Sequence, residues 1–262
     1  MRLLTSATAA EFDTLAAEFL IRQLMAKPAA AVALPAGSTP QGLYTQLRAR
    51  AACGRDRLDQ VRFFDLDEYV GLSAEDSLSF AHFLNRELFR PLGVPRANIR
   101  LLRGDATDLD RECADYETAQ ADAGGLDLAI LGLGANGHIA FNEPGTPWTC
   151  VTHVARLAPE TLASQAQLFT HARLRPERGL TMGIATILRA RAVLLLVAGE
   201  AKRTALTMLL RGIADVFWPA TSLYDHPALT VLCAPEVIAS ESVREAMRRS
   251  RTHEKVHDDH TV

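Results

Sequence analysis

Short apolar runs alternate with amphipathic stretches along most of the chain. The runs are nearly continuous in Ala, Val, Ile and Leu, as expected for strands that are covered on both faces of a parallel sheet. Five of them predict strands, at residues 29–34, 61–64, 126–131, 193–197 and 229–233.

The stretches between these runs have helical periodicity. Phe12, Leu15, Ala16 and Phe19 follow the i, i+3, i+4, i+7 spacing of one helix face. Further helices are predicted at residues 40–51, 76–91, 108–122, 179–190, 200–211 and 240–250. The alternation predicts an α/β fold with an open, doubly wound, mostly parallel and Rossmann-like sheet that carries helices on both faces.

The chain has no linker rich in Gly, Pro or Ser and no internal repeat, which predicts a single domain over residues 1–250. Residues 251–262 are polar and predict a solvated, frayed tail. His257, Asp258 and His260 in this tail leave a metal site as the alternative.

Composition narrows the function classes. With 262 residues, 48% of them hydrophobic, the chain can bury a sizeable core. Its net charge of −3 argues against a nucleic-acid-coating protein, which needs a basic stripe. No run approaches the roughly 20 apolar residues of a membrane span, and no secretory signal is visible, so we expect a cytoplasmic protein. The cysteines lack CxxC spacing and are expected to be free thiols: Cys53, Cys113, Cys150 and Cys233.

Ligands of open α/β sheets bind outside the carboxyl ends of the strands, so the loops after the strands carry the functional argument. In the first such loop, Gly37, Ser38 and Thr39 precede Pro40, which suits the first position of a helix. Backbone N–H groups and two hydroxyls at a helix N-terminus suit a phosphate, whereas the simpler alternative is an ordinary capped helix.

The second loop places three carboxylates within four residues, at Asp65, Asp67 and Glu68. Crowded carboxylates in a partly buried cleft raise at least one pKa, which favours general acid–base catalysis. A magnesium site and plain surface acids are the alternatives.

The third loop has glycines at 132, 134 and 137, in the GxGxxG spacing of a dinucleotide-binding loop. Asn142-Glu143-Pro144 interrupts the long helix that such a loop requires. The alternative is that the glycines bring backbone close to a small ligand and present three polar side chains together: Asn136, His138 and Glu143. An imidazole oriented by a carboxylate is a proton-transfer unit.

The chain resembles the glucosamine-6-phosphate deaminase family in two strings, Asp-Glu-Tyr-Val-Gly at 67–71 and Gly-Ala-Asn-Gly-His-Ile-Ala-Phe-Asn-Glu-Pro at 134–144. The related 6-phosphogluconolactonases share the fold but usually lack Phe-Asn-Glu-Pro. The similarity runs from about residue 10 to about residue 238. It implies conversion of glucosamine 6-phosphate and water into fructose 6-phosphate and ammonia, without a metal or organic cofactor.

The resemblance also implies roles for individual residues. Asp67 would be the base that moves a proton between C2 and C1. His138 would open the pyranose ring, oriented by Glu143 and by Asn136, where many members carry Asp. Glu68 would support the loop of the base. The expected substrate- and phosphate-binding residues are Gly37, Ser38, Thr39, Glu68, Gly137 and Lys202.

Two departures separate this chain from the family pattern. Gln167 stands where members usually carry a phosphate-binding arginine, and Arg173 or Arg175 is left as the substitute. His153 and Ala155 replace basic residues of allosteric members, so we expect no activation by N-acetylglucosamine 6-phosphate.

Residues 145–176 are expected to form a lid by the same resemblance, and Trp148 either closes over the sugar or packs in the core. The Gln167 departure leaves three alternatives open: a deaminase for another hexosamine phosphate such as galactosamine 6-phosphate, a sugar-phosphate lactonase, and a non-catalytic sugar-phosphate sensor. Either a monomer or a homo-oligomer is compatible with the sequence.

Overall fold

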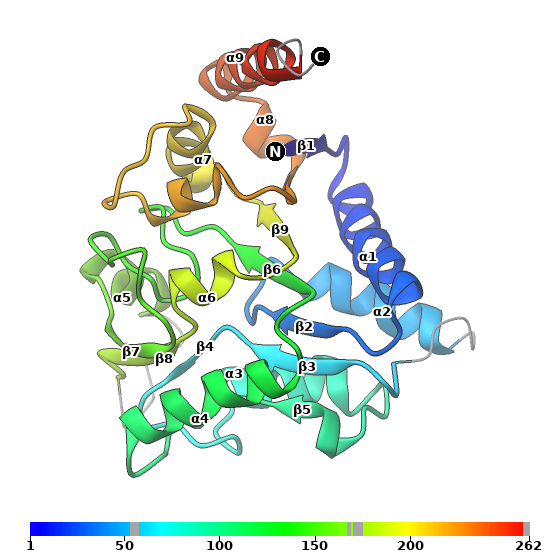
Figure 1. Ribbon diagram of the computed structural model, residues 1–262, viewed down its shortest axis with the longest axis vertical. Helices are drawn as coiled ribbons and strands as arrows, with labels where there is room; N and C mark the ends of the chain where they lie inside the picture. The colour runs from blue at the N-terminus through cyan, green and yellow to red at the C-terminus, as the bar shows by residue number, and fades with distance from the viewer. Residues whose placement is uncertain (53–57, 167–168, 170–174, 259–262) are drawn as a thin grey trace.

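The computed structural model describes residues 1–52, 58–166, 169 and 175–258, with no account of the side chains of residues 52 and 251–258. Its centre is a seven-stranded sheet in which every neighbouring pair is parallel (Figure 1). The strand order is β1 (Arg2–Thr5), β10 (Leu229–Cys233), β9 (Ala192–Val197), β6 (Leu128–Gly132), β2 (Ala31–Leu34), β3 (Arg62–Asp65) and β5 (Ile99–Arg100). The five predicted strands are confirmed, within one or two residues at each end.

The direction of sheet growth reverses between β2 and β6. From β2 the chain adds β3 and β5 on one side, then returns to place β6, β9 and β10 on the other side. The loops that follow β2 and β6 therefore diverge at a topological switch point, which is where ligands of such sheets bind.

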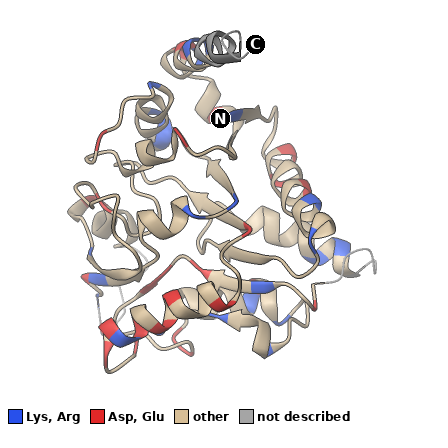
Figure 2. Cartoon of the chain, viewed as in Figure 1, with Lys and Arg blue, Asp and Glu red and all other residues tan. Residues whose placement is uncertain are grey.

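Both faces of the sheet are buried, as the apolar strands predict. Along β2, Ala31 and Ala33 pack on one face, whereas Val32 and Leu34 pack on the other. The second face is covered by α1 (Ala9–Ala26), α2 (Gln41–Ala52), α3 (Phe80–Leu84) and the π-helical turn η1 (Asn85–Phe89). The first is covered by α4 (Leu109–Asp122), α6 (Ile184–Leu188), α7 (Arg203–Leu210), α8 (Pro235–Ile238) and α9 (Glu241–Asp258). Strands β2, β6 and β9 carry no charged residue, and charges gather on the outer elements (Figure 2).

The helix predicted at residues 179–190 is wrong in its first part, because these residues belong to a second, antiparallel sheet. It consists of β4 (Asp67–Tyr69), β8 (Arg178–Thr181) and β7 (His153–Arg156), with β8 in the middle. Pairing with partners far away in sequence overrides the local pattern here. Gly179 permits this pairing because it has no side chain. A Cβ at this position would lie 2.4 Å from the ring of Phe141 and would clash with it. Only residues 184–188 of the predicted helix are helical, as α6.

Other boundaries also shift. The helix predicted at 76–91 begins only at Phe80, where Ser79 caps it, and the helix predicted at 240–250 extends to Asp258. The sequence reasoning missed the short edge strands β1 and β5, because two to four residues give little periodic signal. Short 3₁₀ turns complete the described elements: η2 (Arg96–Asn98), η3 (Glu200–Lys202) and η4 (Pro219–Leu223), while α5 spans Pro159–Gln165.

Cys113, Cys150 and Cys233 are free thiols, as predicted, and Cys53 lies outside the described residues. Within the described chain, none of the helices combines the length and the apolar character that a membrane crossing demands. The metal alternative in the tail rests on His257, Asp258 and His260, whose side chains the structure does not describe.

Candidate active site

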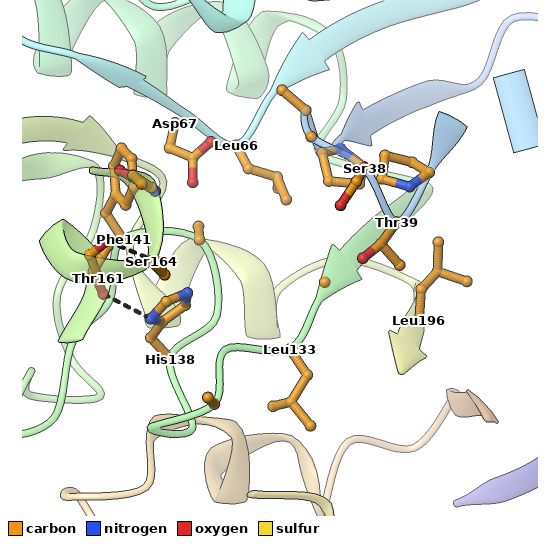
Figure 3. A pocket seen from close by; sticks show the side chains of 18 of the residues that line it. Ser38, Thr39, Leu66, Asp67, Leu133, His138, Phe141, Thr161, Ser164 and Leu196 are labelled. Carbon is orange, nitrogen blue, oxygen red and sulfur yellow. Dashed lines mark hydrogen bonds between the residues drawn. The ribbon is translucent and has the colours of Figure 1, made fainter. Parts of the chain in front are cut away.

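A pocket of about 420 Å³ opens at the switch point of the sheet. Its walls come from the loops after β2, β3, β6 and β9 and from α5 (Figure 3). The pocket unites most of the residues that the sequence singled out: Gly37, Ser38, Thr39, Asp67, Asn136, His138 and Lys202.

The loop after β2 supplies hydroxyls to one side of the pocket. Gly37 has a φ of 105°, a left-handed conformation that glycine adopts without strain, and it turns the chain toward α2. Figure 3 shows the hydroxyls of Ser38 and Thr39 directed toward the open space. Lys202, at the end of η3, adds a cation whose pKa is lowered by burial. This side of the pocket is suited to an anion.

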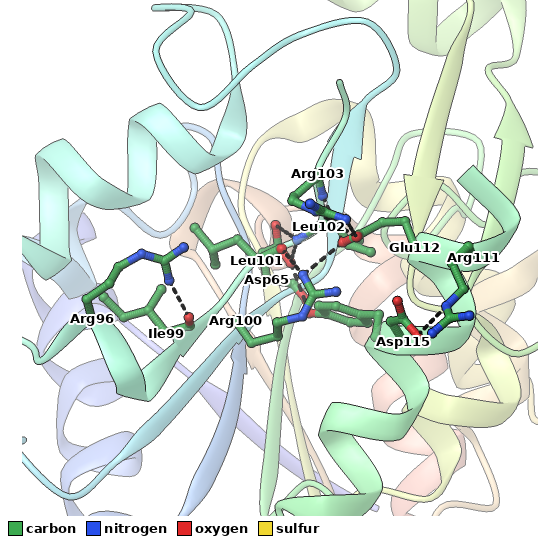
Figure 4. A network of polar contacts seen from close by, with 11 residues as sticks. Asp65, Arg96, Ile99, Arg100, Leu101, Leu102, Arg103, Arg111, Glu112 and Asp115 are labelled. Carbon is green, nitrogen blue, oxygen red and sulfur yellow. Dashed lines mark hydrogen bonds and ion pairs between the residues drawn. The ribbon is translucent and has the colours of Figure 1, made fainter. Parts of the chain in front are cut away.

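The three clustered carboxylates point to three different places. Asp65 is buried in the sheet, where it accepts the Leu102 N–H at 3.1 Å (Figure 4) and lies 2.9 Å from the Tyr116 hydroxyl. Asp67 faces the pocket, and Glu68 turns toward the N-terminus of α3. The three carboxylates therefore do not converge on one point, as the shared ligands of a single ion would.

Asp67 has the electrostatics of a general base. Burial, and then the neighbouring charge of Glu68, raise its pKa to about 8. A carboxylate with a pKa close to the working pH is a stronger base than an exposed aspartate and is still partly ionised.

The sequence predicts two roles for Glu68, and its position favours support of the base loop over contact with the substrate, because Glu68 does not line the pocket. Its carboxylate accepts hydrogen bonds from the backbone N–H groups of Tyr69, Phe80 and Ala81 and from the Ser79 hydroxyl, at 2.7–3.1 Å. It thereby joins β4 to the first turn of α3. We infer that Glu68 stabilises the backbone that carries Asp67 rather than contacting a ligand.

The glycines of the third loop allow close approach of backbone and ring. A Cβ on Gly134 would lie 2.5 Å from the ring of His138, and Gly137 has a φ of 85°. Gly137 is not a lining residue either: its carbonyl accepts the Ala220 N–H, and its missing Cβ makes room for Trp218. No long helix follows, which excludes the dinucleotide interpretation.

His138 lies in a network of short polar contacts. Its Nδ1 is 3.4 Å from Oε2 of Glu143 and 3.2 Å from the hydroxyl of Thr161. Asn136 donates to the same carboxylate at 3.0 Å and accepts the His138 backbone N–H at 3.2 Å. Figure 3 shows the other ring nitrogen directed toward the open pocket. The imidazole therefore has one nitrogen held by hydrogen-bond partners and one that faces the open pocket.

Glu143 is held as a carboxylate although it does not line the pocket. Burial alone would raise its pKa, but the hydrogen bonds and charge of His138, a hydrogen bond from Thr161 and the Ala158 N–H lower the pKa overall. Its negative charge is thus available to stabilise a protonated His138.

The structure also bears on two alternatives that the sequence left open. Trp148 packs against the core cluster and does not line the pocket, so the core-packing alternative is correct. Arg175 lines a separate pocket with Arg156 and Arg178, so it does not replace the missing phosphate arginine. Gln167 and Arg173 lie outside the described residues.

Helix α5 lies within residues 145–176, which the resemblance assigns to a lid, but the sequence singled out none of its residues for the site. Glu160, Thr161, Ser164 and Gln165 line the pocket from this helix. Pro159 in the first turn signals a helix start. No local signal shows where that helix docks, because it does not follow a strand of the central sheet.

Comparison with known proteins decides the family. A model of the family described as glucosamine-6-phosphate isomerases/6-phosphogluconolactonase matches residues 4–231. A glucosamine-6-phosphate deaminase from Shouchella clausii is 41% identical over 226 residues, covering 86% of this chain and 92% of the relative. One from Rhodopirellula baltica is 40% identical, covering 82% and 85%.

The chain belongs to this family. A solved monomeric glucosamine-6-phosphate deaminase is 35% identical with a TM-score of 0.88, covering 91% of this chain and 99% of that one. A 6-phosphogluconolactonase from Trypanosoma brucei has a TM-score of 0.74 at 21% identity, covering 91% and 97%, and shows that this enzyme shares its fold. The protein is therefore an enzyme of the glucosamine-6-phosphate isomerase/6-phosphogluconolactonase family, which confirms the resemblance found in the sequence.

Proposed function

We propose that this enzyme converts glucosamine 6-phosphate and water into fructose 6-phosphate and ammonia. One observation carries the proposal: a carboxylate with a raised pKa and a carboxylate-oriented imidazole face the same pocket from different loops. Ring opening and proton transfer between carbons need two separate acid–base groups, and this pocket holds both.

His138 opens the sugar ring in the first step. Its pocket-facing nitrogen takes the proton from the C1 hydroxyl and delivers a proton to the ring oxygen, which produces the open-chain aldehyde. The imidazole passes through a charged state, which the carboxylate of Glu143 stabilises. Asn136 holds that carboxylate but has no proton to exchange, so it orients the pair.

Asp67 performs the second step. It removes the proton from C2 and returns a proton to C1 through an enolamine, while a proton moves from the amino group to O1, which leaves an imine at C2 and a hydroxymethyl group at C1. Water adds to this imine and ammonia leaves, which gives the ketose phosphate. The buried position of Asp67 strengthens it as a base.

In this proposal the substrate phosphate binds at the opposite side of the pocket, where Ser38, Thr39 and Lys202 are lining residues. Anchoring this remote group holds C1 and C2 between the two acid–base residues, which converts binding energy into orientation. No arginine is among the pocket-lining residues that the structure describes, so Lys202 provides the cationic contact.

The test is a coupled assay that measures ammonia and fructose 6-phosphate from a panel of substrates. Equal release of both products from glucosamine 6-phosphate supports the proposal. Turnover of galactosamine 6-phosphate alone would show that this sugar, and not glucosamine 6-phosphate, is the substrate. Acid release from 6-phosphogluconolactone alone would show that the enzyme is a lactonase. Tight binding of a hexosamine phosphate without turnover would indicate a sensor.

The substrate class also defines the partner and the place of action that we propose. The enzyme binds a small-molecule sugar phosphate, binds neither nucleic acid nor membrane, and acts in the cytoplasm. Light scattering after size exclusion distinguishes a monomer from a homo-oligomer.

A further inference from the structure

Thr161 joins the acid–base network from α5, outside the three loops that carry the sequence motifs. Its side chain is buried on α5, and its hydroxyl lies 3.2 Å from Nδ1 of His138. The same hydroxyl is among the groups that lower the pKa of the Glu143 carboxylate. The backbone N–H of Ala158, at the start of α5, donates to Oε1 of Glu143 at 3.1 Å, whereas His138 lies near Oε2. One short helix and its N-cap residue therefore contact both members of the imidazole–carboxylate pair. Figure 3 shows the Thr161 hydroxyl directed at the His138 ring.

Hydrogen counting fixes the direction of these bonds. Glu143 is ionised, so Nδ1 cannot face it with a lone pair and must carry the proton. The hydroxyl oxygen is the closer acceptor of this N–H, at 3.2 Å against 3.4 Å for the carboxylate. The one hydrogen of the Thr161 hydroxyl is then free to be donated to Glu143.

We propose that Thr161 is a positioning residue whose hydroxyl accepts from Nδ1 of His138 and donates to Glu143, which fixes the Nδ1–H tautomer of the imidazole. The pocket-facing nitrogen, Nε2, is thereby kept unprotonated and ready to take the proton of the C1 hydroxyl. The catalytic part of this inference rests on the proposed deaminase function, whereas the tautomer does not.

Two substitutions of Thr161 distinguish the effect of its hydroxyl from the effect of its size. Thr161→Val keeps the shape and removes the hydroxyl, and Thr161→Ser keeps the hydroxyl. If Thr161 only packs against its neighbours, Thr161→Val is the milder change. If the hydroxyl orients His138, we expect kcat to fall about 10–100-fold in Thr161→Val, the range seen for residues that orient an active group, and to stay within about threefold in Thr161→Ser.

A binding measurement shows that the loss concerns the chemical step. The open-chain analogue 2-amino-2-deoxyglucitol 6-phosphate cannot form a ring, so its binding does not require ring opening. We expect its Kd in Thr161→Val to stay within about threefold of the wild-type value. Circular dichroism and Tm verify that each variant is folded.

The tautomer is read from ¹⁵N chemical shifts of the histidine rings in the substrate-free enzyme, with His138→Gln used to assign the signal. A protonated Nδ1 and an unprotonated Nε2 in the neutral ring support the inference. The opposite tautomer overturns it, as does wild-type kcat in folded Thr161→Val. A wild-type enzyme that fails to deaminate hexosamine phosphates refutes the proposed function instead. The role of Thr161 is then still decided by the same spectrum of Thr161→Val, in which we expect a larger share of the Nε2–H tautomer, and an unchanged spectrum overturns the inference.

Discussion

Asp67 and Glu68 are neighbours in the sequence, yet their carboxylates have opposite surroundings. Asp67 faces the pocket and has a pKa raised by burial, whereas Glu68 accepts four hydrogen bonds near the N-terminus of α3. The strand geometry of β4 explains this, because successive side chains of a strand point to opposite faces. One residue of the pair is thus available for chemistry, and the other holds the backbone in place.

Replacing Asp67 with Asn should remove the base without disturbing the fold. We expect kcat to fall by about 10²–10⁴-fold, the usual contribution of a general base. Ammonia release measures the effect, and circular dichroism verifies folding. Near-normal turnover in a folded Asp67→Asn variant would contradict the role assigned to this residue.

The same substitution should stabilise the protein in a pH-dependent way. Because the pKa of Asp67 rises from 3.8 to about 8 on folding, the native state binds a proton in this range that the unfolded state lacks. Wild-type stability therefore falls as pH rises from about 4 to 8 through this group. The Tm of Asp67→Asn should exceed that of the wild type at pH 8, and the difference should vanish near pH 4. An equal difference at both pH values would contradict the raised pKa.

Glu68→Gln should shift the pH profile of the reaction. The charge of Glu68 is the second cause of the raised pKa of Asp67, after burial. Without that charge, Asp67 should lose its proton at lower pH. The rise of kcat/KM with increasing pH, which reports this deprotonation, should then have its midpoint at lower pH than in the wild type.

Glu68→Gln should also lower the free energy of unfolding by about 1–3 kcal/mol, because an amide cannot accept all four hydrogen bonds. Glu75→Gln, at an exposed position, is the matched control and should change neither quantity. An unchanged midpoint in Glu68→Gln would show that burial alone sets the pKa of Asp67.

Lys202→Met should weaken binding of the substrate phosphate. A hydrogen bond to a charged group contributes about 1.5–3 kcal/mol, which corresponds to roughly a 10–100-fold rise in KM. Lys202→Arg keeps the charge with a different shape and should lose less. Steady-state kinetics on glucosamine 6-phosphate measure both, and equal KM values for the wild type and Lys202→Met would place the phosphate elsewhere.

Asp65→Asn should be tolerated, although Asp65 is buried. The Tyr116 hydroxyl lies 2.7 Å from the Asp65 carbonyl oxygen and 2.9 Å from its carboxyl oxygen, but it has only one hydrogen to donate. A protonated Asp65 satisfies both contacts, in agreement with a pKa that burial raises well above its ordinary value. An Asn amide can make the same bonds.

Thermal unfolding separates this expectation from its opposite. We expect the Tm of Asp65→Asn to lie close to that of the wild type and the Tm of Asp65→Ala to fall, since Ala leaves Tyr116 and the Leu102 N–H with unmet hydrogen bonds. Equal loss in both variants would indicate an ionised Asp65.

The sequence by itself determined the central sheet and the three loops that matter. Continuous apolar runs identify strands buried on both faces, and motifs directly after such strands lie at their carboxyl ends. This reasoning predicts Ser38, Asp67 and His138 at one edge of the sheet, and the structure brings them to one pocket.

Only the tertiary structure decided what lies between these loops. Residues 178–181 form a strand because β4 and β7 pair with them, and Thr161 reaches His138 because α5 docks over the pocket. Likewise, Asp65, Asp67 and Glu68 are chemically similar in sequence, and their burial and hydrogen-bond partners make them a structural acid, a base and a helix anchor. These properties depend on contacts between segments far apart in the chain, which local periodicity does not encode.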